Sequence, residues 1–94
     1  MSDIDDQAIF AQVGDLAVTE APDGYIIDHS ERGTVHFLNP TAVLVYESCD
    51  GKRSVGEIVA LVQRTFGLEE PPAEAVKGCL ADLHAQHLVL PCTP

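Results

Sequence analysis

Leu38-Asn39-Pro40-Thr41-Ala42 marks the point at which this chain changes from the pattern of strands to the pattern of helices. Before it, residues 34–38 (Thr-Val-His-Phe-Leu) are rich in β-branched and aromatic side chains, which favour strands. After it, Asn39 is a favoured helix N-cap, and Pro40 suits the first helical position, where no N–H is needed. The stretch therefore predicts a small sheet followed by helices.

Three strands are expected on the N-terminal side of this point, at residues 13–19, 25–28 and 34–38. Two turn signals separate them, Ala21-Pro22-Asp23-Gly24 and Ser30-Glu31-Arg32-Gly33. Because short connections of this kind join neighbouring antiparallel strands, they predict a meander.

Three helices are expected on the C-terminal side. The first runs from Pro40 to about Cys49, where Asp50-Gly51 stops it. The second begins at the capping box Ser54-Val55-Gly56-Glu57 and ends at Gly67. The third opens at Pro71-Pro72 and fades near Gln86-His87, and Leu88-Val89-Leu90 then forms a last strand or an apolar clasp. The fold class is α+β, with a three-stranded antiparallel sheet followed by three helices, as in a winged helix-turn-helix.

The chain has 94 residues, which is the size of one domain. We expect a flexible acidic N-terminus at 1–12, a folded domain at 13–90 and a loose C-terminus at 91–94. The acidic start is unlike a signal peptide, and no apolar run approaches the ~20 residues that span a bilayer. Cys49, Cys79 and Cys92 form no C-x-x-C pair and are expected to be reduced thiols in the cytoplasm.

Charge excludes the commonest polyanionic partners. Five Lys and Arg residues stand against fifteen Asp and Glu residues, giving a formal net charge of -10. Nucleic-acid affinity depends on basic contacts to phosphates, and binding to anionic lipid depends on basic segments. The composition therefore predicts neither a nucleic-acid partner nor a membrane partner.

No catalytic constellation emerges from the sequence. His84 and His87 are spaced to approach one metal, but zinc needs three or four ligands. In Asp28-His29-Ser30, neighbouring strand residues point to opposite faces, which does not assemble a triad. Cys49 is expected at the C-terminal end of a helix, where the helix dipole does not lower the pKa of a thiol. We expect that the protein is not itself an enzyme and needs no cofactor or metal. A small metal or thiol enzyme is an alternative.

Two other classes of protein are alternatives. A carrier protein needs a serine at a helix start, usually in Asp-Ser-Leu, whereas Arg53 precedes Ser54 here. A winged-helix DNA-binding regulator needs donors on its reading helix, and the third helix offers Lys77 and Gln86 beside acidic residues.

The stretch from Val35 to Leu90 resembles the PqqD-like family, the small recognition elements for ribosomally made, post-translationally modified peptides. The matching motifs, in order, are Leu38-Asn39-Pro40-Thr41-Ala42, Cys49-Asp50-Gly51, Ser54-Val55-Gly56-Glu57-Ile58, Phe66-Gly67 and the apolar end from Leu80 to Leu88. Ala75 departs from the family pattern, which usually has an acidic residue just before Val76. These motifs are mostly helix caps, so they specify a fold more sharply than an activity.

The resemblance implies that a leader peptide adds as a strand to the edge of residues 34–38 and lies against the third helix. Such strand addition takes affinity from main-chain bonds and specificity from side-chain pockets. The implied peptide-binding residues are Arg32, Thr34, Val35, His36, Phe37, Leu38, Val76, Lys77, Leu80, Leu83 and His84. One or both of Arg32 and Lys77 are expected to pair with an acidic residue of the leader.

The resemblance also implies a partner. The bound precursor peptide would pass to a separate modifying enzyme, such as a radical S-adenosylmethionine protein, a cyclase, a dehydratase or a leader peptidase. The same open edge could pair with a second copy, and that homodimer would compete with peptide.

Overall fold

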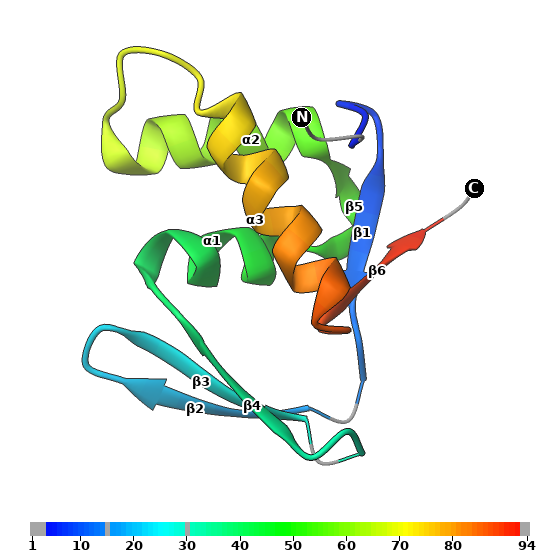
Figure 1. Cartoon of the computed structure of the whole chain (residues 1–94). Coiled ribbons are helices and arrows are strands. Elements are labelled where there is room, and N and C mark those ends of the chain that lie inside the picture. The colour runs from blue at the N-terminus through cyan, green and yellow to red at the C-terminus, as the bar shows by residue number, and fades with distance from the viewer. Residues whose placement is uncertain (1–3, 15, 30, 93–94) are drawn as a thin grey trace.

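The computed structural model describes residues 4–14, 16–29 and 31–92, in which two antiparallel sheets accompany three helices (Figure 1). The α+β class is therefore confirmed. The elements in chain order are β1 (Ile9–Gln12), β2 (Ala17–Ala21), β3 (Gly24–His29), β4 (Thr34–Leu38), α1 (Pro40–Ser48), β5 (Asp50–Ser54), α2 (Val55–Phe66), α3 (Ala73–Ala85) and β6 (Val89–Cys92).

The predicted meander is the sheet β2-β3-β4. Its register places Tyr25 opposite Leu38 and Ile26 opposite Phe37. The phenol of Tyr25 donates to Glu47 of α1 at 2.9 Å, which ties this sheet to the helices. Its first strand begins at Ala17, later than predicted, and Asp15 and Ser30 lie outside the described residues.

Gly24 allows the start of β3 to approach the end of β4 closely. Its φ is +154°, and a Cβ built there would lie 1.8 Å from the carbonyl oxygen of Leu38. Because a side chain has no room at this point, the position requires glycine.

A second sheet, β5-β1-β6, includes elements that the sequence did not indicate. Within the expected flexible segment at 1–12, Ile9–Gln12 form its central strand, which buries Phe10. Within the expected loose end at 91–94, Pro91 and Cys92 belong to β6 and pair with Phe10 and Ile9 of β1. The strand β5 was not expected at all, so the chain is not a single sheet followed by helices.

The predicted caps set the helix boundaries. The side chain of Asn39 accepts the N–H of Ala42 at 2.8 Å, and Pro40 opens α1. At α2 the capping box is complete, with Glu57 N–H donating to Ser54 at 3.2 Å and Ser54 N–H donating back at 2.9 Å. Gly67 closes α2 in the left-handed conformation, with φ 63°.

The core lies where the three helices meet and is closed by strands from both sheets (Figure 1). The largest fully buried side chains come from β3, all three helices and the segment around β6; they include Ile27, Val45, Ile58, Leu80, Leu88 and Val89. Among the described residues, no helix has both the length and the apolar character required to cross a membrane.

Candidate functional site

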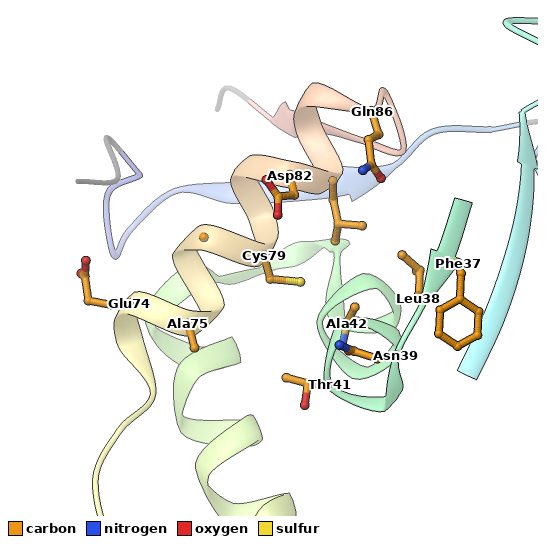
Figure 2. Close-up of a pocket in the computed structure, with 12 residues that line it drawn as sticks. Phe37, Leu38, Asn39, Thr41, Ala42, Glu74, Ala75, Cys79, Asp82 and Gln86 are labelled. Atoms are coloured by element: carbon orange, nitrogen blue, oxygen red, sulfur yellow. The ribbon is translucent and has the colours of Figure 1, made fainter. Parts of the chain in front are cut away.

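A groove of about 510 Å³ lies between the end of β4, the first turn of α1 and one face of α3 (Figure 2). We call it the β4–α3 groove. Its lining residues are Phe37, Leu38, Asn39, Thr41, Ala42, Glu74, Ala75, Gly78, Cys79, Asp82, Leu83 and Gln86. The groove is thus apolar at its base, where Leu38 and Leu83 are buried, and polar at its rim.

The strand β4 has one unpaired edge within the described part of the chain. It pairs with β3 on one side, and the order β2-β3-β4 leaves its other side open. An open edge presents unpaired N–H and C=O groups to an incoming strand. Val35 and Phe37 are also 65% and 58% exposed, respectively, so apolar side chains accompany the free backbone.

Two predicted strand residues line the groove, namely Phe37 and Leu38. Thr34, Val35 and His36 lie further along the same strand, where a ring nitrogen of His36 is 3.1 Å from the hydroxyl oxygen of Thr34. Arg32 lies in the exposed turn before β4 and does not line the groove.

Most residues of the predicted wall on α3 lie on another face of the helix than the one that lines the groove. Val76 and Leu80 are fully buried in the core. Lys77 forms an ion pair with Asp6 at 2.7 Å, and this contact raises the pKa of Lys77. His84 packs edge-on against Phe10, with ring centroids 6.2 Å apart. Of the five wall residues, only Leu83 lines the groove.

The sequence reasoning missed the residues that flank the buried stripe of α3. Ala75, Gly78, Cys79 and Asp82 recur at intervals of three and four, so they share one helix face. The small size of Ala75, Gly78 and Cys79 was the available signal, because small side chains let another backbone approach a helix closely. The face also carries Glu74 and Asp82, whose carboxylates oppose the binding of nucleic-acid phosphates.

Two thiols, one of which lies in the groove, have raised pKa values that make them poorly suited to nucleophilic chemistry. Cys79 lines the groove, and burial raises its pKa to about 11. Burial also raises the pKa of Cys49 to about 12, and its Sγ donates to the carbonyl of Val45 at 3.2 Å. In the described ranges, no group of three or more His, Cys, Asp or Glu side chains is arranged to hold a metal ion.

A small two-sheet scaffold with an open strand edge beside a groove defines a binding module. The family model for coenzyme PQQ synthesis protein D (PqqD) matches residues 24–89, from the start of β3 to the start of β6. The chain belongs to the PqqD family, as the sequence resemblance predicted. No curated protein and no solved structure matches it.

Family membership suggests a general role as a peptide-binding partner protein. PqqD proteins are non-catalytic accessory binding proteins that work with a precursor peptide and a partner enzyme in PQQ biosynthesis. The strands β1 and β2 precede the matched segment, so the central strand of the second sheet lies outside it.

Proposed function

We propose that this protein binds the leader region of a ribosomally synthesised precursor peptide and delivers it to a separate modifying enzyme. The observation that carries the proposal is the adjacency of the open β4 edge to the groove against α3. The backbone of a peptide paired with β4 would form hydrogen bonds with the strand, and its side chains would contact the groove.

The geometry suits an extended peptide. Successive side chains of a strand point to opposite sides, so alternate residues of the added strand face α3 and the others face solvent. Leu38, Leu83 and Ala42 offer apolar contact at the base of the groove, and Asn39, Thr41 and Gln86 offer hydrogen-bonding groups at its rim. The affinity for the peptide would come from main-chain hydrogen bonds to β4, and the specificity for one leader would come from side-chain contacts in the groove.

In this role the protein itself performs no chemistry and acts in the cytoplasm, where precursor peptides are synthesised. The peptide is processed by a partner, for which a radical S-adenosylmethionine protein, a cyclase, a dehydratase and a leader peptidase are the candidate classes. A second copy paired at β4 would block the leader, so any homodimer and the peptide complex would be mutually exclusive.

Amide NMR provides the test, with leader segments of precursors encoded beside the gene as titrants. We expect shifts in residues 34–38 and at Ala75, Gly78, Cys79 and Asp82. Lys77 and His84 are internal controls, because they lie on the same helix but on another face. Shifts confined to Lys77 and His84, or no shifts at saturating leader, would contradict the proposal.

A further inference from the structure

We propose that the β4–α3 groove selects leader peptides that carry two basic residues four positions apart, which pair with Asp82 and Glu74. This inference rests on the proposed function and names the chemistry of its ligand. Glu74 and Asp82 are the charged side chains among the residues that line the groove, and both are exposed at its rim. The groove therefore presents negative charge to whatever enters it.

No cation of the chain compensates this charge inside the groove. All five basic residues are described, and none lines it. Lys77 is paired with Asp6, and Arg53 is paired with Asp50 at 3.4 Å. The expectation of an acidic leader residue meeting Arg32 or Lys77 therefore finds no support in the geometry.

The two carboxylates remain available for a ligand. Within the described residues, neither Glu74 nor Asp82 forms an ion pair. Glu74 acts at longer range on Lys77, whose pKa it helps to raise, but the hydrogen bond of Lys77 goes to Asp6. The net charge of -10 adds a general attraction for cationic peptides, which speeds their encounter with the surface.

Helix and strand geometry fix the spacing of the ligand. Glu74 and Asp82 are eight positions apart, which is about 12 Å along an α-helix. A strand rises about 3.3 Å per residue, so four residues of a peptide lying along α3 cover about 13 Å. Residues i and i+4 of a strand also point to the same side, and both basic side chains can therefore face the helix.

The residue between them should be apolar. Position i+2 of such a peptide faces the middle of the helix, where Ala75, Gly78 and Cys79 are small and Cys79 is half-buried. The long stems of Lys or Arg can lie along this apolar surface while their charged ends reach the rim. The selected pattern is a basic residue, an apolar residue two positions on, and a second basic residue after two more.

A phage-displayed library of random 12-residue peptides tests this selection directly. We expect the wild-type protein to enrich Lys and Arg at the i, i+4 spacing. The double variant Glu74→Lys/Asp82→Lys should instead enrich Asp and Glu. Selected peptides without a charge preference, or with the same preference for both proteins, would overturn the inference.

A binding titration of one selected peptide gives the magnitude. Because exposed ion pairs are individually weak, we expect Glu74→Gln and Asp82→Asn to raise Kd up to about fivefold each at low salt. The double neutral variant should raise it about tenfold, and 0.5 M NaCl should remove most of the difference. Glu70→Gln is the matched control, because Glu70 is exposed in the loop before α3 and does not line the groove.

Amide shifts separate the two possible failures. A peptide that shifts β4 and groove amides but binds the neutral variants equally well overturns the charge inference and leaves the proposed function standing. If neither selected peptides nor leader segments shift β4, both proposals fail.

Discussion

The ammonium group of Lys77 lies 2.7 Å from a carboxylate oxygen of Asp6, and this pair joins α3 to the segment before β1. The backbone carbonyl of Asp6 also accepts the N–H of Gly56 at 2.8 Å, so the same residue contacts the start of α2. Asp6 therefore links two helices on the side of α3 that faces away from the groove.

Neutralising Lys77 should leave leader affinity unchanged, because its side chain is engaged by Asp6. The Lys77→Gln protein should be slightly less stable to urea at pH 7, with a smaller difference in high salt. Since the pKa of Lys77 is raised, the stabilisation is present below the ordinary lysine pKa and is lost as pH rises through the raised value. A fall in leader affinity of fivefold or more would contradict this prediction and would indicate that Lys77 contacts the leader.

Phe37 should contribute to peptide binding more than to folding. It is 58% exposed and lines the groove, so Phe37→Ala should weaken leader binding while changing the free energy of unfolding by less than about 1 kcal/mol. Val18→Ala is the control, because Val18 is an exposed apolar residue (42%) of the same sheet but lies on β2, away from the open β4 edge and outside the groove. Equal losses of affinity in the two variants, measured by calorimetry, would contradict a specific role for Phe37.

Phe10 should be essential for stability, although it lies in a segment that the sequence suggested was loose. It is 5% exposed and packs against His84. Phe10→Ala should cost about 3–5 kcal/mol, a large share of the ~5–15 kcal/mol of a typical domain. Urea unfolding measures this loss. His84→Ala should cost only about 0.5–1.5 kcal/mol, because it removes the ring contact alone.

The three cysteines should differ in reactivity. Burial raises the pKa of Cys49 to about 12 and that of Cys79 to about 11, so at pH 8 both are almost entirely protonated. Because the thiolate is the reactive form, iodoacetamide should modify the half-buried Cys92 first, as peptide mass mapping would show. In urea all three should react alike. Modification of Cys49 as fast as Cys92 in the folded protein would contradict the burial argument.

Local signals predicted the helices and the meander well. Asn39, the Ser54–Glu57 box and Gly67 each satisfy helix-end backbone groups through near neighbours, so their effect can be recognised in a short stretch of sequence. The second sheet depends on partners far along the chain. Its edge strand β5 reads Asp-Gly-Lys-Arg-Ser, which has no alternation and looked like a helix stop followed by a cap.

The strand and the helix predicted for the site both contribute to the groove, but the helix residues named from the sequence lie mostly on another face of α3. Periodicity identified Val76, Leu80 and Leu83 as the apolar stripe of α3, and these residues are buried in the core. The groove uses the adjoining stripe, which includes Ala75, Gly78 and Asp82 and has no strong hydrophobic pattern. Only the packing of α3 against α1 and the second sheet decides which face is left for a ligand.

The pairing of Ile9 with Cys92 has a consequence for the order of events during synthesis. The hairpins of β2, β3 and β4 join near neighbours and can close as soon as they leave the ribosome, whereas β1 must wait for β5 and is paired on both edges only after β6 has emerged. Closing so long a loop is slow compared with forming hairpins. The nascent chain can therefore form the β4 edge before the α3 residues that line the groove have been made, and the groove lining is complete only once Gln86 has emerged.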